Sequence, residues 1–517
     1  MKKSEGTFIE KVIDKAVGLF SAKNEARRVH FRMYARNDEY RTQFQALMSA
    51  RGYKIADPSK LKTPWMGGNQ TADQEVLGSL DPMTAHSREL NRDDPIASGL
   101  TNTFTMNVIG TGMRPQAQTD SDDKNERMER MFSKLKDKVS PVDDMTYGEA
   151  QRMKFKKAFE DGGVLVKQAK IAPEAPVWFE TIEVDRIDTP RDATAKDPNG
   201  VITRGVEKDR NGIPVAYWIK KSKGNIAGLM GVSQNSFERV DADICTHLKF
   251  SDRPGQTHGV PRFHAIAQDL RDLDLLILAS LKRIQVAACL SVFIKSENTL
   301  EDIFEETKNK YGYTMDQSLE PGMMFKLFPG EEIQTLIPNF PTTEFDAFIV
   351  MLARRIGAAL GISWQIVLKD FSKANYSSAR TDLLEARQTY STMQKWFIDK
   401  CLKWEWKVIL NDARLRGEPL MRNITEDDID KIMWIPNGWH WVDPVKESTA
   451  AKIALSLGIT TRQIECAKEG KDWKEVTDQL LKEEQYEMAQ RKSLGLPDMP
   501  PEPSTFNLTF NDGAGSE

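Results

Sequence analysis

The most apolar stretch of the chain, LLILASLKRIQVAACLSVFIK at residues 275–295, limits what this sequence can fold into. A membrane-spanning helix needs about 20 mostly apolar residues, but Lys282 and Arg283 lie near the middle of this stretch. Each would cost about 2.5–3.5 kcal/mol at the centre of a bilayer. Apolar residues recur at three- and four-residue spacing at Ile266, Leu270, Leu273, Ile277, Leu281, Ile284 and Ala288. This spacing predicts a long packed helix, and it leaves open whether the partner is its own domain or a neighbouring subunit.

Composition describes a globular chain with no global attraction to nucleic acid. With 517 residues, 40% hydrophobic and 29% charged, the chain is long enough for about two to four domains. The formal net charge of −4 means that any contact with DNA must be local or weak. The four cysteines lie far apart without a CxxC pair, which argues against a zinc site and a disulfide framework. A reducing cytoplasm is therefore the expected place of synthesis.

The N-terminal segment MKKSEGTFIEKVIDKAVGLFSAKNEARR has no apolar signal-peptide region. It predicts an amphipathic basic helix with Ile9, Ile13, Val17 and Phe20 on one side. Such a helix either docks on its own protein or binds a membrane surface or a partner.

Local patterns divide the rest of the chain. Residues 1–140 have a mainly helical pattern, whereas 164–250 contain short β-rich runs separated by turn signals such as PNG and RNG. Two helical segments follow the small α+β pattern near 291–340, and the second, of about 40 residues, is long enough to predict a kink or an extended assembly element. The Pro- and Gly-rich tail 497–517 is predicted to be disordered.

Motifs for catalysis or cofactor binding are missing from the sequence. GTGMRP lacks the third glycine of a dinucleotide site, no GxxxxGK[ST] or HExxH occurs, and the six histidines have no ligand spacing. The acidic turn ITEDDID is expected to begin a helix and stay solvated. No catalytic residue, metal or cofactor is therefore predicted. A tryptophan cluster favours a packed core over stacking on single-stranded bases, and its members are Trp396, Trp404, Trp406, Trp434, Trp439 and Trp441.

A polar segment, LKDFSKANYSSART at residues 368–381, joins the last two long helical segments. Ser377 or Ser378 is expected to cap the helix that follows. The segment is either a simple hinge loop or a flexible surface that presents cations.

Several segments match one known family in the same order along nearly the whole chain. They are SREL with RDDPIASGL and NVIGTGMRPQ, FEDGGVLVKQ, FETIEVDRIDTP, GVEKDRNGIPVAYW, RPGQTHGVPRFHAIAQDLRDLD, PGMMFKLFPGEEI, KANYSSARTDLLEAR and WVDPVKESTAAKIALSLGITTRQIECAKEGKDW. Together they resemble the portal proteins of tailed bacteriophages, specifically the lambda-type portal family. One position departs from the family pattern, because His258 stands where the family usually has arginine.

The resemblance implies a mixed α+β, mostly helical subunit with a β-rich wing, a two-helix stem, a small α+β clip, a tunnel loop followed by a long kinked helix, and a helical crown. It implies a homo-oligomeric ring, commonly a dodecamer, at the portal vertex of the virion. Double-stranded DNA passes through this ring without sequence specificity. The implied protein partners are the terminase large subunit, a head-tail connector or adaptor protein, and the major capsid and scaffold proteins.

The family organisation, placed on this sequence, gives expected boundaries. These are 1–250 for the wing, within which residues 1–140 are helical and residues 164–250 are β-rich, 262–290 for stem helix 1, 291–340 for the clip, 341–366 for stem helix 2, 367–380 for the tunnel loop, 381–440 for the long helix and aromatic surround, 441–496 for the crown and 497–517 for the tail.

Two sets of residues become candidates. The set expected to face DNA is Lys369, Lys373, Asn375, Tyr376, Ser377, Ser378 and Arg380. The set expected to face the channel or a neighbouring subunit is Lys282, Arg283, Arg354 and Arg355, with ordinary surface salt bridges as an equal alternative for the last two.

Two other function classes remain open. An enzyme acting on DNA during packaging would need a nucleotide or metal site. A peripheral membrane protein would use the basic N-terminal helix, although the resemblance implies no membrane partner.

Overall fold

The computed structural model describes residues 70–140, 144–221, 236–289, 293–296, 331–334, 342–439 and 442–495. The predicted N-terminal basic helix, most of 291–340, Trp441 and the tail lie outside the described residues. The chain forms two compact units. Unit 1 comprises Met1–Thr103, Lys156–Leu165 and Ile182–Thr389, and unit 2 comprises Phe104–Phe155, Val166–Thr181 and Tyr390–Glu517.

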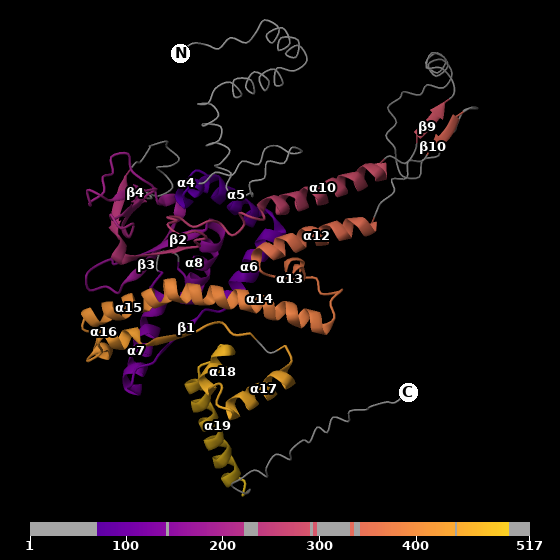
Figure 1. Ribbon diagram of the computed structural model, residues 1–517. Coiled ribbons are helices and arrows are strands. Elements are labelled where there is room, and N and C mark those ends of the chain that lie inside the picture. Colours follow the sequence, from indigo (N-terminus) through magenta and orange to yellow (C-terminus); the bar gives the residue numbers. More distant parts are fainter. Residues whose placement is uncertain are drawn as a thin grey trace, which may run out of the picture. The chain divides into compact units, whose positions relative to one another are not determined.

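The described elements confirm a mixed α+β, mostly helical fold (Figure 1). The helices are α4 Ala72–Leu77, α5 Leu80–Asp93, α6 Pro95–Val108, α7 Asp122–Leu135, α8 Tyr147–Asp161, α10 Ala267–Cys289, α12 Thr342–Leu360, α13 Trp364–Leu368, α14 Tyr376–Phe397, α15 Lys403–Leu415, α16 Glu426–Asp430, α17 Pro444–Ser456, α18 Arg462–Lys468 and α19 Trp473–Ser493. The strands are β1 Arg114–Ala117, β2 Gly163–Ala169, β3 Trp178–Glu183, β4 Val201–Thr203, β5 Val206–Lys208, β6 Pro214–Lys220, β7 Phe237–Asp241, β8 Cys245–Lys249, β9 Phe293–Ser296, β10 Glu331–Gln334 and β11 Ile432–Ile435.

The strands of the predicted β-rich region form two small open sheets. One is antiparallel in the order β4-β5-β6-β7, and the other has the order β3-β2-β8. Their apolar side chains in unit 1 form a buried core that consists of Leu165, Ile182, Ile187, Val206, Tyr217, Ile219, Val240 and Cys245. Along β6, Tyr217 and Ile219 of this core alternate with the more accessible Trp218 and Lys220.

Two glycines of unit 1 bring separate backbone segments into contact. Gly162 has φ +83°, and the peptide oxygen of Gly162 accepts a hydrogen bond from the amide of Phe250 at 3.0 Å. A Cβ on Gly259 would lie 1.8 Å from that same oxygen. Only residues without side chains fit this crossing, which fixes the segment before α10 against the end of α8.

His258, the residue that departs from the family pattern, is fully buried beside this crossing. Its Nε2 donates to the backbone oxygen of Arg204 at 2.9 Å, and its ring meets that of His247 edge-on. Burial lowers the pKa of His258 to about 4. The side chain is therefore neutral near pH 7 and needs no acidic partner.

The predicted aromatic core is confirmed in unit 2. Phe397, Cys401 and Trp406 are buried, and the ring of Trp406 packs against that of Phe132 with 5.1 Å between centroids. A π-helical segment, Ile398–Leu402, separates α14 from α15. The long helix therefore contains a π-helical turn, and the kink or extended assembly element expected from its length stays a prediction.

A buried ion pair crosses the same core. Lys154 of α8 pairs with Glu405 of α15, and both side chains are at most 1% exposed. Glu405 also accepts hydrogen bonds from the hydroxyl of Tyr147 at 2.9 Å and the thiol of Cys401 at 3.4 Å. Burial raises the pKa of both Tyr147 and Cys401. The carboxylate is thus fully satisfied within unit 2.

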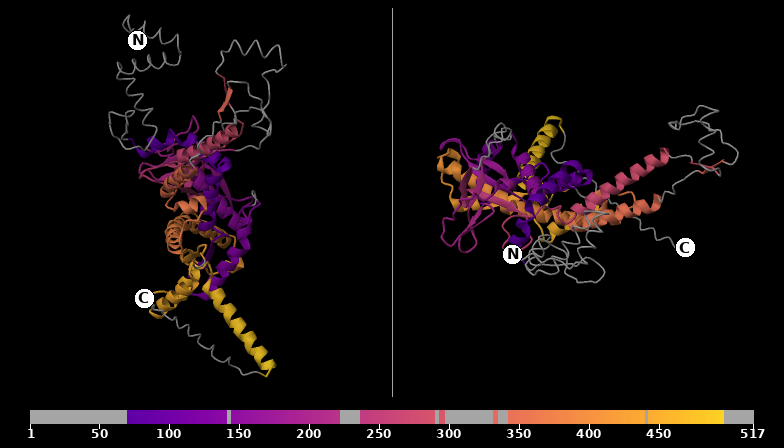
Figure 2. Two further views of the ribbon diagram at one scale, coloured as in Figure 1. Left: turned by 90° about the vertical axis from the view of Figure 1, so that its right-hand side faces the viewer. Right: turned by 90° about the horizontal axis from the view of Figure 1, so that it is seen from above.

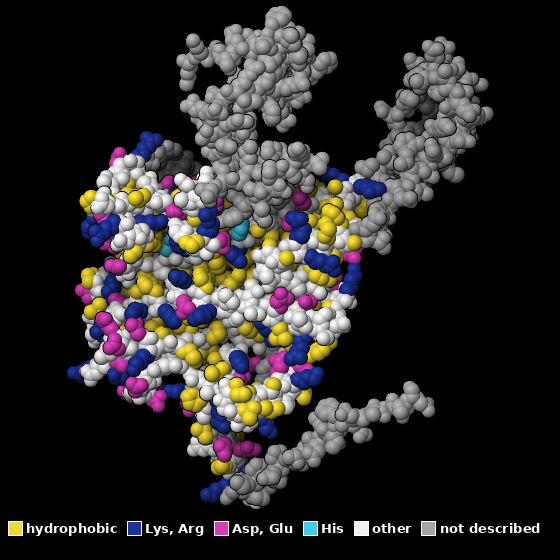
Figure 3. Space-filling model, in the orientation of Figure 1, with side chains coloured by type: hydrophobic (Ala, Val, Ile, Leu, Met, Phe, Trp, Pro, Cys, Tyr) yellow, Lys and Arg dark blue, Asp and Glu magenta, His cyan; other side chains and the backbone are white. Residues whose placement is uncertain are grey.

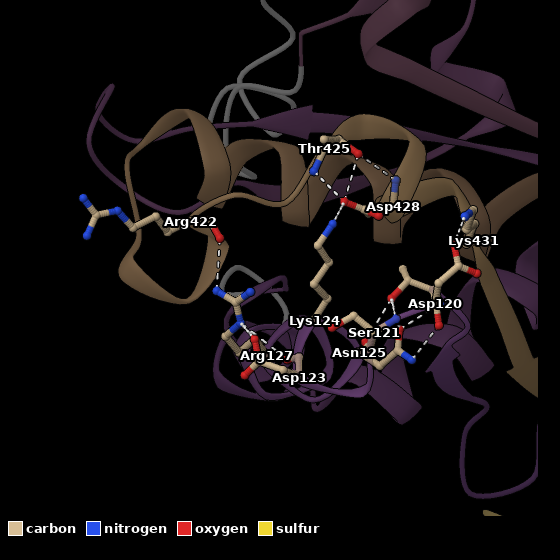
Figure 4. A network of polar contacts seen from close by, with 11 residues as sticks. Asp120, Ser121, Asp123, Lys124, Asn125, Arg127, Arg422, Thr425, Asp428 and Lys431 are labelled. Atoms are coloured by element: carbon tan, nitrogen blue, oxygen red, sulfur yellow. Dashed lines mark hydrogen bonds and ion pairs between the residues drawn. The ribbon is translucent and has the colours of Figure 1, made fainter.

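The acidic turn ITEDDID begins α16, as the sequence predicts, but Asp428 does not remain simply solvated. Its carboxylate accepts hydrogen bonds from Thr425 and from the ammonium group of Lys124 at 2.8 Å (Figure 4). The hydrogen bond from Lys124 lowers the pKa of Asp428 to about 2. The turn therefore ties α16 to α7 within unit 2.

Candidate functional site

The apolar stripe of α10 is buried at one end and exposed at the other. Leu270 and Leu273 are at most 1% exposed, whereas Ile277, Leu281 and Ile284 on the same stripe are 37%, 52% and 49% exposed. The helix begins at Ala267 rather than at the expected residue 262, because residues 262–266 form turns. The first half of α10 thus packs on its own unit, and the second half presents an apolar surface.

Helix α12 extends this surface. It runs beside α10 in the opposite direction (Figures 1 and 2), and its Phe348 and Met351 are 46% and 45% exposed. Apolar side chains are visible on the surface of this region in Figure 3. We call this set the apolar stripe, and its members are Ile277, Leu278, Leu281, Ile284, Phe348 and Met351. Several large apolar side chains exposed on two neighbouring helices are typical of an interaction site.

Arg355 joins the two helices through an ion pair with Asp269. Its Nε and Nη2 bind the two carboxylate oxygens of Asp269 at 3.1 and 3.0 Å. This two-point contact fixes α12 against the buried half of α10. Arg354 lies over the ring of Trp364, 5.9 Å from its centroid. For both arginines, the structure therefore shows contacts within the chain.

The predicted helix 341–366 is interrupted, which corrects the expected boundary. Helix α12 ends at Leu360 and is followed by Gly361 with φ +69°. The oxygen of Gly361 accepts a hydrogen bond from the hydroxyl of Thr389 at 2.8 Å, so the turn is held by α14. The short helix α13 then ends in Lys369, which has a left-handed backbone with φ 54°.

The segment from Lys369 to Asn375 is the observed loop. Lys369 and Lys373 are exposed, and the ammonium group of Lys373 lies 2.5 Å from a carboxylate oxygen of Asp346 on α12. This hydrogen bond raises the pKa of Lys373. The hydrogen bonds that Asp370 accepts from Ser372 lower the pKa of Asp370, which adds a negative charge beside the two lysines. The loop therefore carries only a small excess of positive charge.

The expectation that 367–380 form one loop is wrong at its C-terminal end. Tyr376 begins α14, so Tyr376, Ser377, Ser378 and Arg380 lie in its first turns. Asn375 is the capping residue, since its side chain accepts the amide of Ser378 at 2.8 Å. The sequence analysis expected Ser377 or Ser378 in this role. Asparagine caps a helix as well as serine does, so the sequence alone did not distinguish these three neighbouring residues.

The remaining candidates do not join this loop through any contact described for them. Lys282 and Arg283 are exposed on α10. The sequence did not indicate Asp346 or Asp269 as partners, because each lies more than twenty positions from the cation that it binds. Two aromatic residues here are exposed, Phe371 within the loop at 38% and Tyr376 at the start of α14 at 58%.

No group of three or more potential ligands for a metal ion occurs within the described residues. Of the helices that the structure describes, none is both long and apolar enough to cross a membrane. The features of this region are thus an apolar surface, a short weakly basic loop and the salt bridges that hold them.

Comparison with known proteins gives one consistent family. Residues 59–394 match the model of the phage portal protein, lambda family. The chain is similar to a probable portal protein of Halomonas phage phiHAP-1, with 27% identity over 469 residues that cover 86% of this chain and 88% of the relative. It is also similar to portal protein B of Escherichia phage lambda, with 22% identity over 267 residues, 47% of this chain and 49% of the relative.

Among solved structures, the chain is similar to a protein in the neck of an empty GTA particle. The identity is 14%, the TM-score is 0.47, and the match covers 74% of this chain and 93% of the other.

Proposed function

Because this chain belongs to the lambda family of phage portal proteins, we propose that it forms the ring-shaped channel at one vertex of a phage head. Double-stranded DNA is packaged through this channel by the terminase motor, retained there, and ejected through it. The role is structural rather than enzymatic, and the protein is a component of the virion made in the host cytoplasm.

The observation that carries this proposal is the apolar stripe. An isolated subunit leaves Leu281 and Ile284 about half exposed, which is unfavourable by about 25 cal/mol for each Å² of apolar surface in water. In a closed ring every subunit has two neighbours, so a stripe on one subunit is covered by a different surface of the next. Assembly into a ring therefore removes the exposed apolar surface from water.

The regions of the ring follow from the family organisation. We assign α10 and α12 to the stem, the segment around β9 and β10 to the clip that docks terminase and the head-tail connector, and α17–α19 to the crown. The segment 369–375 becomes the tunnel loop, and the described residues before α10 become the wing. The major capsid and scaffold proteins are the expected partners at the vertex.

Substituting the apolar stripe is expected to prevent ring assembly. In Leu281→Glu with Ile284→Glu, two carboxylates would have to be buried between subunits, so the fraction of chains in rings should fall at least about tenfold. Mass measurement in solution and negative-stain images give the readout, with rings of about twelve copies expected for the unmodified chain.

The matched control is Arg271→Glu, which makes the same change in net charge at an exposed position of α10. It should leave assembly intact. A chain that remains monomeric without any substitution, even at high concentration, would overturn the proposed function.

The tunnel loop is proposed to contact the DNA backbone. Lys369 is exposed at the end of α13 and Lys373 lies beside it, with Asp346 and Asp370 limiting the positive charge. Each neutralised phosphate adds affinity that depends on salt and not on sequence. Repeated around a ring, a weakly basic loop holds a duplex while still allowing it to slide.

Replacing both lysines is expected to weaken DNA retention without affecting rings. For Lys369→Ala with Lys373→Ala, the slope of log affinity for duplex DNA against log salt should become shallower by about 0.9 for each phosphate that is no longer neutralised. Purified rings and a DNA-retention assay give the two readouts. Lys395→Ala with Lys403→Ala removes two exposed lysines that pair with Asp399 and serves as the control. Equal retention in both variants would reject the assignment.

A further inference from the structure

The loop 369–375, which connects α13 to α14 (Figure 1), is anchored at both of its ends. At its start, the amides of Lys369 and Asp370 both donate to the backbone oxygen of Gln365 on α13, the second at 3.0 Å. At its end, Asn375 caps α14. Movement of the loop relative to these helices is therefore confined to the residues between the two anchors.

The tip of the loop forms a defined turn. The carboxylate of Asp370 accepts a hydrogen bond from the amide of Ser372 at 2.9 Å, and the amide of Ala374 donates to the backbone oxygen of Phe371 at 3.0 Å. Lys373 lies within this turn. Its direction is therefore set by the backbone of the turn as well as by the partner of its ammonium group.

One exposed ion pair joins the tip to α12. The ammonium group of Lys373 lies 2.5 Å from a carboxylate oxygen of Asp346, and the two side chains are 61% and 60% exposed. Among the residues that the structure describes, no other hydrogen bond or ion pair connects 369–375 with α12. A pair with this exposure favours the paired over the free lysine by only about 1.5- to fivefold. A competing anion can therefore displace the carboxylate.

Duplex DNA is such an anion. It carries one negative charge for about every 1.7 Å of its axis, and each lysine that binds a phosphate releases condensed counterions. A phosphate that approaches Lys373 also approaches the carboxylate of Asp346. Because the two anions repel each other, exchange of one for the other is favoured over sharing of the ammonium group.

We propose that Asp346 and the phosphates of DNA compete for Lys373, so that Asp346 holds the tip of the loop on α12 until a phosphate takes its place. This inference rests on the proposed contact between the loop and DNA, and it makes Asp346 a positioning residue for Lys373. Each subunit then frees its lysine only where the duplex reaches it. The same exchange releases the tip from α12.

The substitution Asp346→Asn tests the competition in full-length rings, because asparagine has nearly the same size and no charge. It should raise the affinity for a short DNA duplex by about 2.5- to sixfold for each subunit in contact, since the lysine is then always free. In rings that carry Lys373→Ala, the same substitution should change the affinity by less than about 1.5-fold. An equal gain in that background would mean that Asp346 repels DNA directly, and it would overturn the proposed pairing.

A matched control separates the pairing from net charge. Glu385 is exposed on α14, and Glu385→Gln changes the net charge of the chain by the same amount as Asp346→Asn. Glu385→Gln should leave the affinity for the duplex within about 1.5-fold of that of unmodified rings. A gain as large as that of Asp346→Asn would assign the effect to net charge and overturn the proposal.

Trypsin gives a second readout that needs no DNA. Cleavage after a lysine requires its side chain to enter the protease, so the rate of cleavage after Lys373 follows the fraction of free lysine. Without DNA, Asp346→Asn should accelerate this cleavage about 2.5- to sixfold, with cleavage after Lys369 in the same chain as the reference. Equal acceleration at both lysines would mean that the whole loop has loosened, and it would overturn the specific contact.

The possible results separate this inference from the proposed function. If Asp346→Asn rings bind the duplex with the affinity of unmodified rings, the competition is overturned and the proposed function stands. If unmodified rings bind no DNA, the proposed contact of the loop is overturned and this inference with it.

Discussion

Replacing Gly259 with alanine is expected to lower the free energy of unfolding of unit 1 by about 3–5 kcal/mol. The new Cβ would lie 1.8 Å from the oxygen of Gly162 and 2.9 Å from the amide nitrogen of Phe250. Both are backbone atoms, so no side chain can move aside. The segment around Gly259 would have to move away from Gly162 and Phe250, which would break the hydrogen bond that the amide of Val260 donates to the oxygen of Phe250 at 3.3 Å. Hydrogen exchange of amides 156–165 and 245–263 in the full chain measures this loss.

Alanine substitutions at two other glycines separate the cost of a steric clash from the cost of a positive φ angle. Gly78 has φ −68° and open space around it, so Gly78→Ala should change the stability by less than about 1 kcal/mol. Gly255 also has open space but φ +76°, so Gly255→Ala should cost about 1–2 kcal/mol. A Gly259→Ala effect no larger than that of Gly255→Ala would contradict the role of the crossing.

Replacing Lys154 with methionine is expected to destabilise unit 2 by about 3–5 kcal/mol, because Glu405 would remain buried without its cation. The double variant Lys154→Met with Glu405→Gln removes both charges and retains an acceptor for Tyr147. It should lie within about 1–2 kcal/mol of the unmodified chain. Urea unfolding followed by tryptophan fluorescence measures the four chains of the cycle.

An exposed pair on the neighbouring turn provides the comparison. Lys403 pairs with Asp399 at 2.7 Å with both side chains accessible to water, so Lys403→Met should cost no more than about 1 kcal/mol. If Lys154→Met lowered the free energy of unfolding no more than Lys403→Met does, the stability of unit 2 would not depend on compensating the buried charge of Glu405.

Patterns of short range predicted much of the fold. The change from helical to alternating sequence patterns located the strands β2–β8, and the apolar spacing located α10. The tryptophan cluster indicated the packed core that contains Trp406 and Trp434. The order of motifs indicated the family that residues 59–394 match. These features were predictable because each depends on residues close together in the sequence or on the order of motifs along the chain.

The structure differs from the sequence-based predictions where contacts between residues far apart in the sequence determine the local structure. The apolar pattern continues through Ile362 and Ile366, yet α12 ends because Gly361 is held by Thr389 of another helix. The pairs of Lys373 with Asp346 and of Lys154 with Glu405 join positions that no local pattern relates. The exposure of half the α10 stripe likewise follows from which segments of the chain reach it, and spacing alone contains no such information.

The division of the chain into interleaved units also determines when it can fold during synthesis. The chain passes from one unit to the other five times, and the core of unit 2 joins Phe132 to Trp406. Those rings are about 270 residues apart, which a ribosome translates in roughly 15–55 s. Throughout that interval the nascent chain carries apolar surfaces whose partners have not yet been made. The core of unit 2 can therefore form only after the segment that contains Trp406 has been synthesised.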